Sequence, residues 1–437
     1  MGYSFIYQQY EKYHKRIFST ITFLFTSCCK NDVPEIIEPP TPPRTFNYNV
    51  PSHDWENYTA DWIDLAGITT NNGFTQADSY NTNSAYADFN FDGYIDIMIQ
   101  PNVNDGVPVE SFFLINNGDD TFYVDGDFPL IVETSAISSR KTIVGDFNGD
   151  NKPDVVRPQG GHDFLGKPTI TLSNSDNSYT FRLIGDGPDM QSHTVCSGDI
   201  DNDGDLDLFF AQSGEKDGFL INDGNANFTW KWISEIIEGF TDGFLYPDGN
   251  FGPYGIWSSE MTDIDNDGYV DLIVGGRYQD NVNHPHLEGP SIFWGNGTGK
   301  FFVNNSTILF NDLNQLDYLA NGDRIDLSQD YSVNDIDGDG INDIAIYSDT
   351  RNATHGRLFQ VFQGLGNREF KDLTVEWLPD YYKTSSHPNY VWIVLRDIDN
   401  NGQIDFVESQ PRIHTTQSVV RNSLHWEWNG SSFTKEN

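Results

Sequence analysis

One nine-residue pattern recurs six times along this chain of 437 residues. It reads Asp-x-Asp/Asn-x-Asp/Asn-x-x-x-Asp, and we number the copies loop 1 to loop 6 in chain order. Their residues at positions 1, 3, 5 and 9 are Asp88, Asn90, Asp92 and Asp96; Asp146, Asn148, Asp150 and Asp154; Asp199, Asp201, Asp203 and Asp207; Asp263, Asp265, Asp267 and Asp271; Asp335, Asp337, Asp339 and Asp343; and Asp397, Asp399, Asn401 and Asp405. Recurrence every 53 to 72 residues predicts a fold built from one repeated structural unit.

Oxygen-bearing side chains at alternate positions allow each loop to wrap a single hard cation. Calcium accepts six to eight oxygen ligands in flexible geometry, whereas magnesium demands a near-ideal octahedron, so calcium is the expected cofactor. The main-chain carbonyl at position 7 is a further expected ligand. The residues at this position are Tyr94, Lys152, Asp205, Tyr269, Ile341 and Gln403.

Position 6 of the pattern is where each loop has to turn sharply. It is Gly in five copies and Asn151 in loop 2, and both residue types tolerate left-handed backbone geometry. The alternative, an EF-hand, needs a Glu at position 12 and flanking helices. Position 12 is a Glu in loop 6 alone (Glu408), and strand-like runs such as residues 95–99 and 270–274 follow the loops. These features predict strand–loop–strand hairpins and exclude the EF-hand.

A second signature follows each loop: a turn of Asn and Gly, in a looser version before Phe181 and Phe370, that leads to a Phe. This Phe lies 29 to 38 residues after the first Asp of the loop. Residues 114–118, leading to Phe122, are one example, and residues 220–224, leading to Phe228, are another. Such a turn joins two strands. Each repeat therefore contains four strands, A to D, with the acidic loop between A and B, and repeated four-stranded antiparallel units form a β-propeller.

The two signatures together resemble the FG-GAP/VCBS repeats of integrin-α-type calcium-binding β-propellers, and the likeness extends over residues 80–437. It implies an all-β fold of four-stranded blades with calcium held in the A–B hairpins. Six repeats imply six blades. Residues 46–79 could supply a closing strand or a degenerate seventh blade, and the spacing leaves six and seven blades both open.

The N-terminus has the features of a secretory signal with a lipid anchor. A basic stretch at residues 12–16 precedes an apolar core at residues 17–25, which is too short to span a membrane. The following small residues and cysteines resemble the lipobox of bacterial lipoproteins, although Phe25 stands where Leu is usual. We expect residues 1–27 to be the signal and Cys28 to carry the lipid, with Cys29 as the alternative.

Residues 28–45 are rich in proline and predict an extended tether, on the order of 50 Å long at about 3 Å per residue. A lipid, a tether and a propeller describe a surface-exposed protein anchored to the outer membrane, with outer-membrane proteins as possible partners. The net charge of −40, from 25 Lys and Arg against 65 Asp and Glu, excludes nucleic acid as a partner, because its phosphates would be repelled.

Strand order places the A–B loops and C–D turns at one end of the propeller and the B–C and D–A connections at the other. Arginine is scarce, yet four B–C connections each place one near a histidine. The residues expected to bind ligand at that end are Arg157, His162, Arg277, His284, His286, Arg351, His355, Arg412 and His414. Arginine binds carboxylate or sulfate in bidentate fashion, and aromatic rings in the long D–A connections stack on sugars.

These residues lead to one favoured function and two alternatives. The favoured function is binding of extracellular polysaccharide; an anionic glycan suits the Arg and His set, although the net charge opposes it. The first alternative is a polysaccharide lyase, with His162, His193, His284, His355 or Tyr331 as the base and Arg277 or Arg351 neutralising the uronate carboxylate. The second is a protein-adhesion or scaffold module.

Overall fold

The computed structural model forms one compact unit from Thr41 onward. The structure describes residues 44–55, 82–101, 109–118, 122–124, 131–133, 141–158, 166–174, 176, 178–190, 192–212, 217–240, 256–276, 290–309, 325–350, 357–379, 392–396, 402–409 and 425–435. No helix among these residues is long and apolar enough to cross a membrane.

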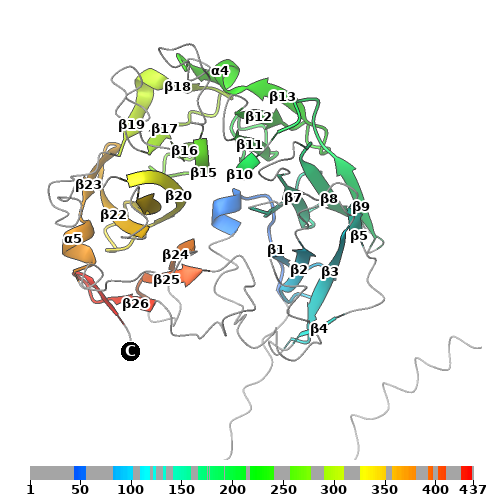
Figure 1. Cartoon of the computed structure of the whole chain (residues 1–437), viewed down its shortest axis with the longest axis horizontal. Coiled ribbons are helices and arrows are strands. Elements are labelled where there is room, and N and C mark those ends of the chain that lie inside the picture. Colours follow the sequence, from blue (N-terminus) through cyan, green and yellow to red (C-terminus); the bar gives the residue numbers. More distant parts are fainter. Residues whose placement is uncertain are drawn as a thin grey trace, which may run out of the picture. The chain divides into compact units, whose positions relative to one another are not determined.

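Six four-stranded antiparallel sheets form the blades of a β-propeller, as Figure 1 shows. In each blade the four strands pair in the order in which they occur along the chain. Blades 1 to 3 consist of β1 (Thr82–Ala87), β2 (Asp96–Pro101), β3 (Val109–Asn116) and β4 (Phe122–Val124); β6 (Ile143–Gly145), β7 (Asp154–Arg157), β8 (Thr169–Ser173) and β9 (Tyr179–Leu183); and β10 (Ser192–Gly198), β11 (Asp207–Gln212), β12 (Gly218–Ile221) and β13 (Thr229–Trp232).

Blades 4 to 6 consist of β15 (Ile256–Thr262), β16 (Asp271–Gly276), β17 (Ser291–Phe293) and β19 (Ser306–Ile308); β20 (Ile325–Asn334), β21 (Asp343–Thr350), β22 (Arg357–Gly366) and β23 (Glu369–Asp372); and β24 (Trp392–Arg396), β25 (Asp405–Ser409), β26 (His425–Trp428) and β27 (Phe433–Lys435). The predicted all-β propeller fold is confirmed, and the structure decides for six blades.

A few short elements decorate this ring. Strand β5 (Ile131–Glu133) pairs with β3, and β14 (Ile237–Glu238) pairs in parallel with β18 (Phe301–Phe302). The helices α4 (Ile233–Ile236) and α5 (Thr374–Trp377) each have four residues, and η3 (Val303–Asn305) has three. The predicted strand content therefore accounts for nearly all regular structure among the described residues.

The hydrophobic core lies between neighbouring blades. Phe209 and Phe219 of blade 3 share a cluster with Leu272 and Phe293 of blade 4, and the other described clusters join successive blades in the same way. Trp294 belongs to the cluster between blades 4 and 5 and is 1% exposed. Cys196 is fully buried within β10, as expected for an inert thiol. Burial of large rings between sheets is the main force that holds blade against blade.

Residues 44–55 lie across the end of the propeller that carries the acidic loops. Main-chain N–H of Arg44 donates to Gly93 O of loop 1, at 3.1 Å, and Asn49 Nδ2 donates to Gly204 O of loop 3, at 2.9 Å. Tyr48 and Trp55 are buried in the core between blades 1 and 2, with ring centroids 4.6 Å apart. The described part of residues 46–79 thus contains no strand, and it crosses several blades.

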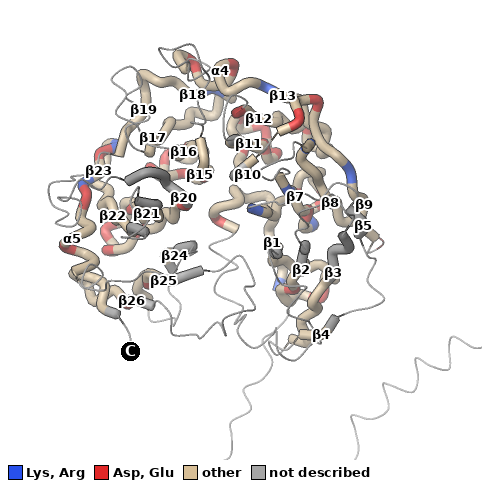
Figure 2. The backbone as a smooth tube through the Cα atoms, viewed as in Figure 1, with Lys and Arg blue, Asp and Glu red and all other residues tan. Residues whose placement is uncertain are grey.

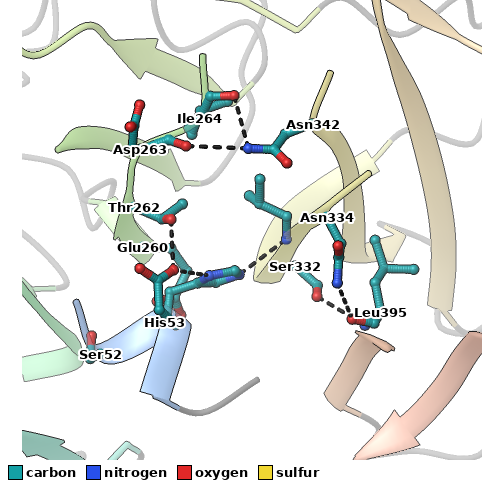
Figure 3. A network of polar contacts seen from close by, with 12 residues as sticks. Ser52, His53, Glu260, Thr262, Asp263, Ile264, Ser332, Asn334, Asn342 and Leu395 are labelled. Carbon is teal, nitrogen blue, oxygen red and sulfur yellow. Dashed lines mark hydrogen bonds and ion pairs between the residues drawn. The ribbon is translucent and has the colours of Figure 1, made fainter. Parts of the chain in front are cut away.

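The segment ends in one helical turn, residues 52–55, inserted among the A strands (Figure 1). Each of its residues bonds to an A strand near the start of an acidic loop, as Figure 3 shows for His53. Ser52 Oγ accepts from Ser197 N, His53 Nε2 accepts from Val333 N, Asp54 accepts from Thr262 Oγ1, and Trp55 Nε1 donates to Tyr86 O. These contacts reach blades 1, 3, 4 and 5, so the turn ties together sheets that are far apart in the sequence.

Candidate metal centres

The five loops that the structure describes completely, loops 1 to 5, share one hydrogen-bonding scheme at position 1. In loop 3, Asp199 Oδ1 accepts from Asp203 N at 3.1 Å and Oδ2 accepts from Gly204 N at 2.9 Å. The equivalent bonds form around Asp88, Asp146, Asp263 and Asp335. The carboxylate at position 1 therefore holds the turn at positions 5 and 6 closed, with the loop's other oxygens gathered around it.

The turn needs left-handed backbone geometry at position 6, as the sequence predicts. Its φ angle is +58° at Asn151 in loop 2 and between +85° and +98° at the five glycines. Position 4 also adopts positive φ in loops 1 to 5, including Phe91 at +61°. Position 4 is Gly or Asn in the other five copies, residue types that tolerate this geometry, so Phe91 alone adopts it against the preference of its side chain.

Position 9 carries a deeply buried carboxylate in every blade. Asp96, Asp154, Asp207, Asp271, Asp343 and Asp405 are each at most 1% exposed. In loop 4, Asp271 Oδ2 accepts from Ile264 N at 2.9 Å, and Oδ1 accepts from Gly295 N at 2.7 Å. Gly295 follows strand C, so this aspartate joins the A–B loop to the C–D turn of its blade, and loops 1, 2, 3 and 5 repeat the arrangement.

Burial raises the pKa of four of these carboxyl groups, Asp96, Asp154, Asp207 and Asp271, to about 8, and that of Asp343 to about 7. The two backbone N–H donors oppose this rise, and neighbouring loop carboxylates add to it. A buried anion with further anions beside it is unfavourable unless a cation neutralises the group. The pKa values therefore identify positions where a bound cation would relieve a large electrostatic cost.

Three loops bring carboxylate oxygens close enough to share one ion. The oxygens lie within 4.8 Å of one another in groups formed by Asp199, Asp201 and Asp203; by Asp263, Asp265 and Asp271; and by Asp335, Asp337 and Asp339. In loop 3, Asp201 Oδ1 and Asp205 Oδ1 are buried and have no hydrogen-bond partner among the described residues. Oxygen donors of this kind, in a preformed turn, fit calcium. Asp397, Asp399 and Asn401 of loop 6 lie outside the described residues, whereas Gln403 and Asp405 lie within them.

Most residues predicted to bind ligand at the other end also lie outside the described residues. These are His162, Arg277, His284, His286, Arg351, His355, Arg412 and His414. His193 belongs to β10, and the structure does not describe its side chain. Arg157 is 1% exposed at the end of β7, and Tyr331 is 3% exposed, with its hydroxyl 3.0 Å from Ser258 Oγ of blade 4. The predicted ligand residues thus stay predictions.

Two polar features near the axis had no signal in the sequence. Lys141, which precedes β6 in blade 2, forms a buried ion pair with Glu260 in β15 of blade 4. His53 Nδ1 lies 3.4 Å from Asp54 Oδ1, while its Nε2 accepts from Val333 N (Figure 3). Figure 2 marks the charged residues along the backbone, and the red of Asp and Glu recurs round the ring far more often than the blue of Lys and Arg. The Lys141–Glu260 pair and the His53 contact with Val333 each join parts of the chain that are distant in sequence, which no local pattern could indicate.

Comparison with known proteins identifies the repeats. The model of the FG-GAP-like repeat matches residues 199–274 and 335–407, which contain loops 3 and 4 and loops 5 and 6. These two segments are therefore similar to FG-GAP-like repeats, as the sequence signatures predict. No curated protein matches the chain.

Two solved structures with limited similarity are rhamnogalacturonan lyases. The exotype enzyme YesX is 13% identical, with a TM-score of 0.27, over 84% of this chain and 57% of its own length. A Bacillus licheniformis rhamnogalacturonan lyase is 11% identical, with a TM-score of 0.26, over 85% of this chain and 61% of its own. This chain thus spans less than two thirds of the length of either enzyme.

Proposed function

We propose that this chain is a calcium-stabilised β-propeller, anchored to the outer membrane by a lipid on Cys28, which binds extracellular polysaccharide. Ligand binding would take place at the end of the propeller opposite the acidic loops. The observation that carries the proposal is the difference between the two ends of the propeller. The acidic loops and residues 44–55 occupy one end, and the strand order leaves the B–C and D–A connections at the other.

The case for calcium rests on loop geometry that is ready for an ion. Each described position-1 carboxylate already closes its turn, and the position-9 carboxylate sits buried beneath it. Groups of three carboxylate oxygens within 4.8 Å would repel one another strongly without a cation. Calcium supplies two positive charges per loop and accepts oxygen ligands in this irregular arrangement.

The case for the opposite end rests on access to the axis. At the loop end, the helical turn at residues 52–55 fills the space among the A strands, and His53 is 3% exposed. A ligand near the axis would therefore approach from the other end, where three B–C connections each contain an arginine and a histidine, and a fourth contains His162. Arginine grips carboxylate groups bidentately, which suits an acidic sugar.

Isothermal titration calorimetry against acidic and neutral polysaccharides, with calcium present, tests the binding function. Arg351→Ala should weaken binding of an acidic glycan by at least about tenfold, the usual cost of losing a charge-assisted contact. Lys300→Ala is the matched control, because Lys300 is an exposed cation in the C–D connection of blade 4, at the end of the propeller that carries the acidic loops. Absence of binding to every glycan would contradict the proposal, and release of an unsaturated uronate would favour the lyase.

Anchoring has its own test. Cys28→Ala should abolish lipid labelling and release the propeller from the outer membrane into the soluble fraction, whereas Cys29→Ala should leave both unchanged. The opposite pattern would move the lipid to Cys29. Lack of labelling in the unaltered protein would remove the anchor from the proposal.

A further inference from the structure

Arg368 occupies an unusual place in the C–D turn of blade 5. The hairpin between β22 and β23 has the two-residue turn Asn367-Arg368, with φ angles of +52° and +65°. Turns with two positive φ angles strongly favour Asn followed by Gly, because a side chain at the second position is strained. An arginine at this position therefore costs backbone energy, which contacts of its side chain must offset.

Those contacts lead into loop 4 of the neighbouring blade. Arg368 Nε lies 2.6 Å from Asp265 Oδ2, and Nη2 lies 3.0 Å from Asp267 Oδ2. The guanidinium also stacks 4.8 Å from the centre of the Trp294 ring. The guanidinium is thus fixed by two carboxylates and one aromatic face, a geometry that lysine could not reproduce.

Both carboxylates belong to the predicted ligand set of loop 4, at positions 3 and 5. In loops 3 and 5 the grouped oxygens come from positions 1, 3 and 5, whereas in loop 4 they come from positions 1, 3 and 9. Asp267, at position 5, is the member that the loop 4 group lacks, and it is one of the two that bind Arg368.

Contacts at the other loops differ in charge. In loop 5 the equivalent outer oxygen, Asp337 Oδ2, accepts from the neutral Gln363 Nε2 at 2.7 Å. In loop 2, Lys152 Nζ lies 3.7 Å from a single carboxylate oxygen, Asp150 Oδ2. Loop 3 has buried carboxylate oxygens without a hydrogen-bond partner among the described residues. Among the described contacts of loops 2 to 5, loop 4 therefore receives the most positive charge from the protein itself.

We propose that Arg368 is a built-in counter-ion that makes loop 4 a distinctly weaker calcium site than loops 3 and 5, an inference that rests on the proposed binding of calcium. A unit positive charge on two ligand carboxylates repels a divalent ion and draws Asp267 away from it. The guanidinium and the ion would lie on opposite sides of one carboxylate, and nearby water screens them. The repulsion between them therefore reduces the calcium affinity of loop 4 by about tenfold. When calcium is scarce, the same ion pairs keep blade 5 attached to loop 4.

The test measures calcium bound per chain, by elemental analysis after dialysis at a series of buffered free-calcium concentrations. Arg368→Gln should keep the ion of loop 4 down to about tenfold lower free calcium than the unaltered protein. Over that range of free calcium it should hold one more ion per chain than the unaltered protein. Arg182→Gln is the matched control: Arg182 also reaches the next blade, but its Nη2 donates to a carbonyl, Ala226 O, and not to a loop carboxylate. Its calcium retention should not change.

A second substitution assigns the gained ion to loop 4. Adding Asp265→Asn to Arg368→Gln should abolish the gain, because it removes one of the grouped ligands. Unchanged or weaker retention in Arg368→Gln would overturn the inference, and so would a gain that survives Asp265→Asn.

Thermal unfolding provides a readout that does not depend on counting ions. Without calcium, Arg368→Gln should melt below the unaltered protein, because Asp265 and Asp267 lose their cation. Saturating calcium should close most of that difference, and a difference that stays constant would mean that Arg368 is merely a packing residue. If the unaltered protein binds no calcium even at millimolar concentrations, the proposed calcium scaffold itself fails, whatever Arg368 does.

Discussion

Loops 3 and 4 begin with the same six residues, Asp-Ile-Asp-Asn-Asp-Gly, yet their electrostatic surroundings differ. Loop 3 adds a fifth carboxylate, Asp205, and holds buried carboxylate oxygens without a hydrogen-bond partner among the described residues. Loop 4 has Tyr269 at the same position and receives Arg368 from the next blade. The shared residues dictate the shared backbone turn, whereas the neighbours decide how much negative charge is left for a cation. We expect loop 3 to depend on calcium most and loop 4 least.

Removal of calcium from the whole protein should produce the largest effect. Chelation leaves uncompensated carboxylates in each loop, and we expect the melting temperature to fall by more than about 10 °C. Differential scanning calorimetry with and without chelator measures the shift. A melting temperature that chelation leaves unchanged would contradict the expected difference between loops 3 and 4, because no loop would then depend on an ion.

Substitution of the buried position-9 aspartates should rank the two loops. Asp207→Asn and Asp271→Asn each replace an acceptor oxygen by an NH₂ group that faces a backbone N–H, at a cost of about 2–4 kcal/mol in the free energy of unfolding. Denaturant unfolding in calcium measures the loss. It should be larger for Asp207→Asn, because loop 3 also loses ion affinity without an arginine to compensate. Equal losses would mean that Arg368 does not distinguish the loops.

Acidification should stabilise the calcium-free protein. The pKa of Asp96, Asp154, Asp207 and Asp271 is about 8 in the folded state and near 4 when unfolded, so the folded state binds the extra protons. The contribution of these carboxyl groups to the free energy of unfolding is fully present below about pH 4 and is lost as the pH rises through 8. We expect the melting temperature without calcium to drop between pH 6 and pH 8. With saturating calcium this drop should disappear or reverse, because protons then compete with the ion.

The smallest expected effect concerns the residue that separates the two loop sequences. Burial and the neighbouring loop carboxylates raise the pKa of Asp205 to about 6. Asp205→Asn should therefore stabilise the calcium-free protein at pH 7 by roughly 0.5–1 kcal/mol, while weakening calcium binding a few-fold. Tyr269→Asn in loop 4 is the control, since it alters the same position without removing a charge. Denaturant unfolding measures the change in stability, and calcium titration measures the change in affinity. Equal effects of Asp205→Asn and Tyr269→Asn would contradict the prediction.

Local patterns sufficed for the parts of the fold that depend on neighbouring residues. The acidic spacing, the turn residue at position 6 and the Asn/Gly turns predicted strand–loop–strand hairpins, four strands per repeat and a propeller. Even the left-handed conformation of Asn151 followed from residue type. Positive φ at Phe91 did not, because the loop's closure forces it against the preference of the side chain.

Contacts between distant segments lay beyond such patterns. Nothing in residues 46–55 suggested that His53 would bond to Val333, 280 positions away, or that Tyr48 would pack into the core of blades 1 and 2. Nor did the turn Asn367-Arg368 reveal that its arginine reaches Asp265, 103 residues earlier. These pairings exist because the ring closes, and ring closure is a property of the assembled sheets.

The sequence by itself determined the repeat, the hairpins and the cluster of oxygen-bearing side chains in each loop, because all of these depend on residues within a few positions of one another. The tertiary structure alone decided that there are six blades, that residues 44–55 cross the loop end, and which loop receives an arginine. The reason is geometric: the charge around a loop includes what the adjacent blade brings to it, and that is fixed only when the blades pack side by side.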